Sequence, residues 1–298
     1  MKNVLNTETK PFVKWAGGKR QLLPIIIKNL PKELIENRIK TYIEPFVGGG
    51  AVFFYIVENY KLDRIILNDK NEELIDVYRV IQNNVDALID ELRKVEKEYL
   101  SLDENGRKAY FYEKRDQYNS NKKDKILTAV NFIFLNRTCF NGLYRVNKKG
   151  EFNVPYGRYK NPTILDEENL RNVSICLKNV ELHSGDFEEI ENYVDDKSFI
   201  YLDPPYRPLD ATSNFTSYDK GEFNDDDQKR LAAFYRLLNE KGAKLMLSNS
   251  DPKNIDEKDD FFDELYKGFN IKRVYANRMI NSNGKGRGKI AELLITNY

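Results

Sequence analysis

The sequence predicts an α/β fold in which a parallel sheet covered by helices is interrupted by a mainly helical insertion. Strand and helix patterns alternate over residues 40–83 and again from Val173 to the end of the sequence. Between them, residues 85–135 carry apolar side chains at helical spacing and no strand pattern. Such alternation is typical of a parallel sheet. The 298 residues and 41% hydrophobic content are sufficient for a sizeable core.

The first alternating segment contains two predicted strands and two predicted helices. Residues 40–44 and 64–68 are short apolar runs that each end at a polar turn. Residues 51–59 open on glycines and continue as a helix. Residues 71–83 form a second helix, because four apolar residues share one face: Leu74, Val77, Tyr78 and Ile81.

The insertion is predicted to span residues 80–160, which leaves 1–79 and 161–298 as the two parts of one discontinuous domain. Residues 126–134 are apolar and helix-like, whereas 136–160 are rich in Asn, Gly, Arg and aromatic residues without clear periodicity. In the earlier part of the insertion, four apolar residues recur at helical spacing: Leu88, Leu92, Val95 and Tyr99.

Composition indicates an ordinary soluble protein, with 32% charged residues and a net charge of +1. Neutral overall charge does not exclude nucleic acid, because residues 137–160 carry six basic residues against one acid, Glu151. Cys139 and Cys176 form no disulfide framework or zinc pattern, and the single His183 sits in a strand-like run, so we expect no metal. No signal peptide or membrane-spanning run is visible, so we expect a cytoplasmic location.

The motif Asp203-Pro204-Pro205-Tyr206 follows an apolar run, residues 198–202, that reads as a buried strand. Two prolines cannot continue a central strand, so the chain turns there. An acid and an aromatic ring therefore stand at the carboxyl end of a strand, the edge at which open α/β sheets bind ligands. The motif resembles the active site of methyltransferases that act on exocyclic amino groups. The alternative is a Pro-Pro turn with an exposed aspartate.

These residue types suit methylation of an adenine amino group, whose lone pair is delocalised into the ring. Two acceptors on its N–H groups favour a more tetrahedral nitrogen: the Asp203 carboxylate and the backbone carbonyl of Pro204, whose direction the ring constrains. Tyr206 offers a face on which a flat base can stack.

A glycine-rich turn follows the first predicted strand: Glu44-Pro-Phe46-Val-Gly48-Gly-Gly50. Glycines allow positive φ and close approach of a ligand to the backbone. Asp69 comes nineteen residues after Gly50, at the end of the next strand, the spacing of an acid that accepts from ribose hydroxyls. This combination predicts nucleotide binding. The alternative is a tight strand–helix turn.

Two further motifs are candidates for the same ligand. Asp186 and Phe187 follow a strand-like run and could bond an adenine amino group and cover its ring, or form a simple Gly-Asp turn. Lys14-Trp15-Ala-Gly-Gly-Lys19 holds the only tryptophan beside two lysines, and Lys19 could reach a carboxylate. Alone, that stretch would be interpreted as a tryptophan packed in the core.

Taken together, these motifs resemble the Dam-type DNA adenine-N6 methyltransferases of the α group. The resemblance also includes Asn141-Gly-Leu-Tyr-Arg145, Glu151-Phe-Asn-Val-Pro-Tyr-Gly-Arg-Tyr159, Phe215-Thr-Ser-Tyr218 and Leu247-Ser-Asn249, in family order. It implies a Rossmann-like methyltransferase domain with an inserted target-recognition domain. It also implies S-adenosylmethionine as methyl donor, with S-adenosylhomocysteine as product, and double-stranded GATC or a close variant as substrate.

The resemblance assigns roles to individual residues. Trp15, Lys19, Asp69 and Asp203 match cofactor-binding positions, with Phe46, Gly48, Gly50, Asp186 and Phe187 as further candidates. DNA contacts are implied for Lys14, which reaches the outer guanine, and for Phe140, Asn141, Leu143, Arg145 and Pro155. Residue types support this assignment. Arg145 can bond guanine O6 and N7, and Leu143 can touch a thymine methyl. Phe140 can wedge into the space of a flipped base, and Arg158 can contact phosphates. The role of Tyr144 stays open, and no base contact is assigned to residues 284–289.

Two other functions are considered. One is methylation of another planar amine, such as cytosine N4 or an RNA adenine; an aspartate at position 203 favours adenine. The other is a DNA-binding module without activity. The intact Asp203–Tyr206 motif and glycine turn argue against that function. The sequence leaves open whether a separate restriction endonuclease is the partner, and we expect a monomer or a weak dimer.

Overall fold

The computed structural model describes residues 9–15, 17–207, 223–277 and 289–298. The chain divides into two compact units. The first unit comprises Met1–Gly18, Gly48–Asn59 and Asn71–Ser184. The second unit comprises Lys19–Val47, Tyr60–Lys70 and Gly185–Tyr298.

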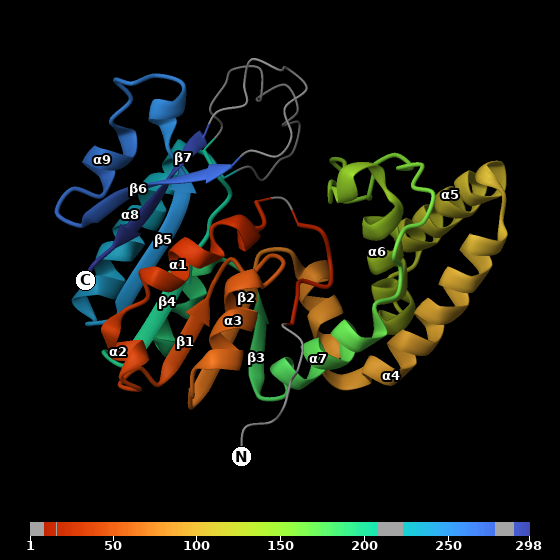
Figure 1. Cartoon of the computed structure of the whole chain (residues 1–298), viewed down its shortest axis with the longest axis horizontal. Coiled ribbons are helices and arrows are strands. Elements are labelled where there is room, and N and C mark those ends of the chain that lie inside the picture. Colours follow the sequence, from red (N-terminus) through yellow and green to blue (C-terminus); the bar gives the residue numbers. More distant parts are fainter. Residues whose placement is uncertain (1–8, 16, 208–222, 278–288) are drawn as a thin grey trace. The chain divides into compact units, whose positions relative to one another are not determined.

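The described strands form a seven-stranded sheet in the order β3-β2-β1-β4-β5-β7-β6, drawn in Figure 1. The strands are β1 (Thr41–Glu44), β2 (Arg64–Asp69), β3 (Val180–Ser184), β4 (Ser198–Leu202), β5 (Lys244–Ser250), β6 (Asn270–Asn277) and β7 (Lys289–Thr296). β1 pairs in parallel with β2 and β4, and β4 with β5. β7 is antiparallel to β5 and β6. The predicted α/β fold class with a mainly parallel sheet is confirmed.

The strand order creates a switch point between β1 and β4 in the second unit. From β1 the chain proceeds to β2 on one side, and β4 and β5 follow on the other. Ile43 lies opposite Ile200, and Leu202 opposite Leu247, so the parallel strands end at nearly the same level. All five residues of β4 are buried. Ligands of open α/β sheets bind where the strand order reverses, at the carboxyl ends of the strands.

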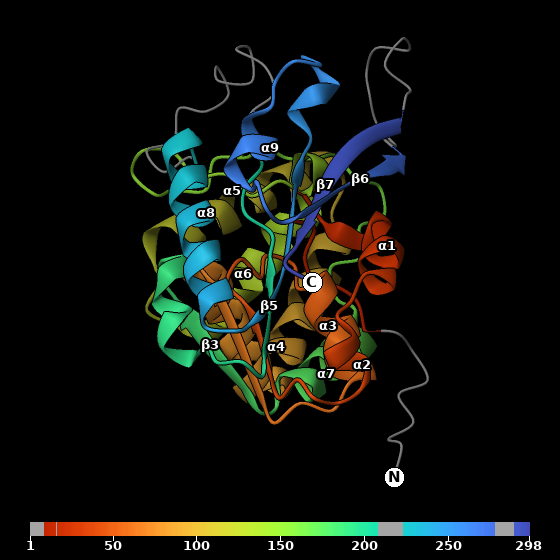
Figure 2. The ribbon, with the colours of Figure 1, turned by 90° about the vertical axis from the view of Figure 1, so that its left-hand side faces the viewer.

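Helices of the second unit are short, apart from α8. They are η1 (Lys19–Gln21), α1 (Leu23–Lys28), α2 (Lys32–Ile35), η3 (Phe187–Tyr193), α8 (Asp225–Glu240), η5 (Pro252–Asn254) and α9 (Phe261–Leu265). Asn224 caps α8 by accepting from the backbone N–H groups of Asp226 and Asp227, two donors that a helix start leaves unpaired. α8 runs beside β5, as Figure 2 shows. Its residues Leu231, Tyr235 and Leu238 join the core of the sheet.

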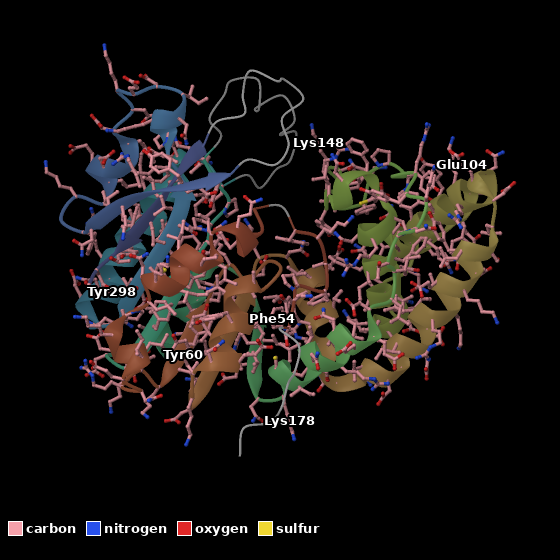
Figure 3. All side chains as sticks on the ribbon, in the orientation of Figure 1. Phe54, Tyr60, Glu104, Lys148, Lys178 and Tyr298 are labelled. Carbon is pink, nitrogen blue, oxygen red and sulfur yellow. The ribbon has the colours of Figure 1, made fainter. Side chains whose placement is uncertain are left out.

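The first unit is mainly helical, with α3 (Ala51–Asn59), α4 (Glu72–Ser101), α5 (Glu104–Ser120), α6 (Lys125–Thr138), η2 (Phe140–Gly142) and α7 (Glu167–Leu177). The predicted helix 71–83 is longer than expected. It continues past a kink at Asn84, whose φ of −139° and ψ of 34° are not helical, and reaches Ser101. In Figure 3, Glu104 and Lys148 project outward, whereas Phe54 of α3 is buried.

Candidate active site and candidate DNA-binding surface

The Asp203 carboxylate stands directly after β4, beside the switch point of the sheet. Lys19 places its ammonium nitrogen 2.8 Å from Oδ1, and the Ser248 hydroxyl of β5 donates to the same oxygen at 3.0 Å. The side chain is 18% exposed. Burial raises the pKa of Asp203 above its usual range, and the Lys19 charge and the two hydrogen bonds oppose that rise. The result is a desolvated carboxylate held in one orientation.

A buried chain of amides holds the turn that follows Asp203. Gln228 of α8 donates to the Pro205 carbonyl at 3.1 Å, and Asn249 of β5 donates to the Gln228 side-chain oxygen at 3.2 Å. Both amides are completely buried. Pro204 is buried and Pro205 is exposed. Proline rings fix φ, and the amide of Gln228 fixes the Pro205 carbonyl. Two independent restraints therefore set the direction of the backbone at this turn.

The Tyr206 ring is held at its hydroxyl and on one face. Its hydroxyl donates to the Glu292 carboxylate of β7 at 2.5 Å, and the Lys19 ammonium lies 4.5 Å from the ring centroid. Burial raises the pKa of Glu292. Sequence reasoning missed Glu292. A lone acid within the apolar run at the end of the sequence was the available signal.

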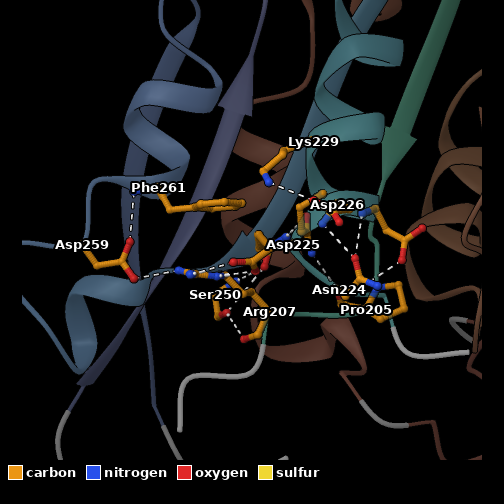
Figure 4. Close-up of polar contacts among 12 residues, drawn as sticks. Pro205, Arg207, Asn224, Asp225, Asp226, Lys229, Ser250, Asp259 and Phe261 are labelled. Atoms are coloured by element: carbon orange, nitrogen blue, oxygen red, sulfur yellow. Dashed lines mark hydrogen bonds and ion pairs between the residues drawn. The ribbon is translucent and has the colours of Figure 1, made fainter. Parts of the chain in front are cut away.

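Arg207 anchors the other side of the motif, as Figure 4 shows. Its guanidinium bonds Asp225 through two nitrogens, at 2.7 and 3.0 Å, and Asp259 at 2.7 Å. The same group stacks 4.3 Å from the Phe261 ring centroid. Bidentate pairs of this kind are geometrically specific. Arg207 therefore connects the turn to the start of α8 and to α9. Sequence reasoning also missed this role of Arg207.

The glycine turn owes its composition to close packing within the first unit. Gly48 and Gly50 have φ of +47° and +74°. A Cβ on Gly48 would lie 2.7 Å from the Trp15 ring, and one on Gly50 would lie 2.7 Å from the Tyr78 hydroxyl. That hydroxyl donates to the Gly48 carbonyl at 3.0 Å. Both glycines are therefore required by the fold itself.

Within the second unit, acids stand at the carboxyl ends of three neighbouring strands. Glu44 is the last residue of β1, Asp69 is the last residue of β2, and Asp203 directly follows β4. Glu44 is buried and accepts from the Tyr42 hydroxyl at 2.7 Å. Asn68, which sequence reasoning did not single out, donates to the carbonyls of Pro45 and Gly185 at 3.1 Å each and so ties the strand ends together.

Asp186 and Phe187 have protein partners of their own. Asp186 accepts from the Glu188 backbone N–H at the start of η3 and pairs with Arg230 at 2.9 Å. Burial acts to raise the pKa of Asp186, but the Arg230 hydrogen bond and the backbone N–H outweigh it and hold that pKa below its usual range. Phe187 is buried against Phe46, with ring centroids 5.4 Å apart.

The residues predicted to contact DNA lie in the first unit, and all of them are exposed. Phe140 and Leu143 are 51% and 41% exposed, and Asn141 adopts a φ of +56° between them. Arg145 is exposed and donates to the Asn153 side chain at 2.7 Å. The Pro155 carbonyl accepts from the Phe140 N–H at 2.8 Å. These side chains are therefore accessible from solvent.

Lys14 and Arg158 complete the predicted set. Lys14 is exposed, with its ammonium 4.6 Å from the Tyr159 ring centroid, and Arg158 is exposed with a φ of +55°. Residues Phe215–Tyr218 and 284–288 lie outside the described residues. Among the described residues, no group of His, Cys, Asp or Glu side chains could hold a metal ion. Within the same residues, no helix is long and apolar enough to span a membrane.

A mainly parallel sheet that carries an Asp-Pro-Pro-Tyr turn beside its switch point is the arrangement of a methyltransferase that acts on an amino group. The comparison with protein families agrees: residues 15–280 match the family model of the D12 class N6 adenine-specific DNA methyltransferases. The chain belongs to this family and is an adenine-specific DNA methyltransferase.

Similar proteins carry related names. A Type II methyltransferase, M.MjaIII, of Methanocaldococcus jannaschii is 60% identical over 294 residues, covering 98% of this chain and all of the relative. A Type II methyltransferase, M1.LlaDCHI, of Lactococcus lactis is 40% identical, covering 100% of this chain and 98% of the relative. The DNA adenine methylase of Escherichia coli K12 is 35% identical, covering 96% of this chain and 95% of the relative.

Proposed function

We propose that this enzyme methylates N6 of adenine in double-stranded GATC sites, with the target base flipped into a pocket at Asp203–Tyr206. The observation that carries the proposal is the Asp203 carboxylate, desolvated beside the switch point and held by Lys19 and Ser248. GATC is supported by the resemblance of the segment Asn141–Arg145 to the Dam-type enzymes. The choice of adenine is supported by relatives named DNA adenine methylase. Flipping is required because an adenine amino group inside a duplex cannot reach a side chain at the end of a strand.

The family implies S-adenosylmethionine, which when bound supplies an electrophilic methyl sulfonium. The second unit has groups of suitable chemistry. Carboxylates at the ends of adjacent strands accept from ribose hydroxyls or from an ammonium, and Lys19 offers a cation for a carboxylate. We assign Asp69 to the ribose, Asp186 and Phe187 with Phe46 to the adenine of the cofactor, and Lys19 and Asp203 to its amino-acid end. In the first unit, we assign Trp15 and the backbone at Gly48 and Gly50.

In the reaction, Asp203 accepts one N–H of the target amine, and the Pro204 carbonyl accepts the other. Their fixed directions favour the tetrahedral nitrogen that attacks a methyl group, at no cost of reorganisation. The face of the Tyr206 ring opposite Lys19 stacks on the target base. Lys19 favours the ionised form of Asp203, since its charge opposes the effect of burial on the Asp203 pKa. As the N–C bond forms and the S–C bond breaks, the amino nitrogen loses one proton, so the products are N6-methyladenine, S-adenosylhomocysteine and a proton.

Residues 80–160 act in this proposal as a target-recognition domain inserted between residues 1–79 and 161–298. Arg145 reads a guanine edge, Leu143 contacts a thymine methyl and Phe140 fills the space of the flipped base. The remaining contacts are assigned to Lys14 at the outer guanine, to Asn141 and Pro155 beside the bases, and to Arg158 at the phosphates. We further propose that no metal takes part and that the enzyme acts in the cytoplasm as a monomer or weak dimer.

The test is methylation of duplexes that contain GATC or one of its single-base variants, with labelled S-adenosylmethionine. We expect label in adenine of GATC, and no label with Asp203→Asn, which keeps the shape of the side chain but not its charge. Equal labelling of every duplex would overturn the specificity, and label in cytosine would overturn the choice of base.

The Type II names of two relatives support a second proposal, that the enzyme protects DNA from a separate restriction endonuclease. Plasmid from cells that express the enzyme should then resist an endonuclease that cuts unmethylated GATC. Cleavage of that plasmid at every GATC site would contradict the proposal.

A further inference from the structure

Tyr144 lies in the segment Asn141–Arg145, but its ring faces the interior of the first unit. It stacks on the Trp15 indole, with centroids 5.5 Å apart and planes at 25°, and on Phe132 of α6, at 5.2 Å and 27°. Trp15 and Phe132 are themselves parallel within 17°, at 6.5 Å. Aromatic pairs in this geometry add to the energy of simple burial. One side chain of the recognition segment is therefore in direct contact with the only tryptophan.

The Tyr144 hydroxyl is anchored at Glu73, in the first turn of α4. It donates to the Glu73 carboxylate at 2.5 Å, and Tyr118 and Lys122 donate to the same carboxylate. Burial acts to raise the pKa of Glu73, but the Lys122 ammonium and the phenol groups outweigh it and hold that pKa below its usual range. Glu73 thus stays charged and fixes the tilt of the Tyr144 ring on Trp15.

A second contact joins the same two segments. Asn136 of α6 is almost completely buried and accepts from the Lys14 N–H at 2.8 Å. Its amide donates to the carbonyls of Lys14 at 2.8 Å and Gly142 at 3.1 Å. Gly142 packs so closely on the Lys14 side chain that a Cβ there would lie 2.3 Å from it. Displacement of the recognition segment would therefore displace the backbone at Lys14 and Trp15.

We propose that Tyr144 is a positioning residue that couples DNA binding at residues 140–145 to cofactor binding at Trp15. DNA bound at the segment stabilises the stack on Trp15, and a cofactor held against Trp15 stabilises the segment through the same stack. Such coupling is reciprocal, so DNA and cofactor each raise the affinity for the other by the same factor. The inference rests on the proposed function, because it requires Trp15 to contact the cofactor and the segment to contact DNA.

The experiment uses the emission of Trp15, which reports on this contact alone because the sequence has one tryptophan. The dissociation constant of S-adenosylhomocysteine is measured by Trp15 emission and by calorimetry, with and without a GATC duplex. We expect the duplex to tighten binding about 5-fold or more in the wild type. In Tyr144→Ala the factor should fall clearly below the wild-type value, because the contact through Asn136 still joins the two segments. Tyr144→Phe keeps the ring, so it should retain part of the coupling.

The matched control is Tyr118→Phe, which removes a phenol from the same Glu73 carboxylate but leaves the Tyr144 ring on Trp15. It should retain the wild-type coupling, whereas a general loss of stability would weaken binding with and without the duplex and leave the ratio unchanged. Unchanged coupling in both Tyr144 variants, or a wild-type factor of about 1, would overturn the inference alone. Calorimetric binding without any change in Trp15 emission would instead overturn the cofactor contact on which it rests.

Discussion

The motif around Asp203 and the segment 140–145 differ in how far their side chains are buried and held by neighbouring residues. Asp203 is desolvated, and buried or half-buried partners from several elements hold it and its turn: Lys19, Ser248, Gln228 and Glu292. Phe140, Leu143 and Arg145 are exposed, and the residues between and beside them provide the anchoring. Chemistry on an amine benefits from groups that need no reorganisation. In the proposed function, these side chains must reach a base and therefore stay exposed, although Arg145 also donates to the Asn153 side chain.

The comparison predicts that loss of a held group affects catalysis, and loss of an exposed group affects discrimination. The largest effect should come from Asp203→Ala. Its carboxylate is the one side-chain acceptor that we place on the reacting amine, so methyl transfer should fall about 100-fold or more. Single-turnover rates at saturating cofactor measure this loss. Calorimetry with S-adenosylmethionine separates it from weaker cofactor binding. Near wild-type turnover would falsify the assignment of the active site.

Asp69→Ala should act on the cofactor instead. Loss of a charged hydrogen bond to a ribose hydroxyl costs roughly 1.5–3 kcal/mol of binding. The dissociation constant of S-adenosylmethionine, measured without DNA, tests this expectation. An unchanged constant would show that another acid, such as Glu44, holds the ribose.

Arg145→Ala tests the exposed segment and should reduce affinity for the cognate site and discrimination between sites. We expect a cost of about 1–3 kcal/mol at GATC and a similar loss of discrimination at the guanine that Arg145 contacts. The matched control is Lys148→Ala, three residues further along the chain, which should weaken all DNA about equally and lower the salt slope by roughly one. Methylation rates on GATC and on each single-base variant distinguish the two. If Arg145→Ala slowed every site by one factor, Arg145 would be a phosphate contact.

The smallest change should be a shift in pH dependence. Asp203 must be ionised to accept from the amine, and burial raises its pKa, so activity is present above that pKa and is lost as the pH falls through it. Lys19 lowers the same pKa. Lys19→Met should therefore move the acid limb of the kcat profile to higher pH, measured at saturating cofactor because Lys19 is also assigned to binding it. A limb that stayed in place would mean that another group sets it.

The local elements could be predicted because their patterns are local. The predicted helix 51–59 and strand 198–202 match α3 and β4, since apolar runs bounded by turn residues define them. The predicted helix 71–83 stops too early, because the regular pattern breaks at Asn84, where the structure shows a kink and not an end. The antiparallel edge formed by β6 and β7 has no comparably clear signal in the sequence.

The supports of the site could not be predicted in the same way. Gln228, Glu292 and Glu73 act on residues far away in sequence. Glu292 stands out only as an acid in an apolar run, and nothing near Gln228 or Glu73 distinguishes them from ordinary polar residues. Only the three-dimensional packing brings a partner to each. Tyr144 is the clearest example, because the sequence left its role open, whereas the structure shows its ring packed inward on Trp15.

The reactivity of the two cysteines can report on local unfolding within the first unit. Cys139 ends α6 at the base of the segment 140–145, where its thiol donates to the Leu143 carbonyl at 3.2 Å. Cys176 lies in α7, with its sulfur 3.7 Å from the Thr9 hydroxyl. Burial raises the pKa of each thiol to about 11, so both stay protonated and unreactive while covered. The alkylation rate of each thiol therefore measures how often the structure around it unfolds locally. The two thiols report on two different places in the first unit.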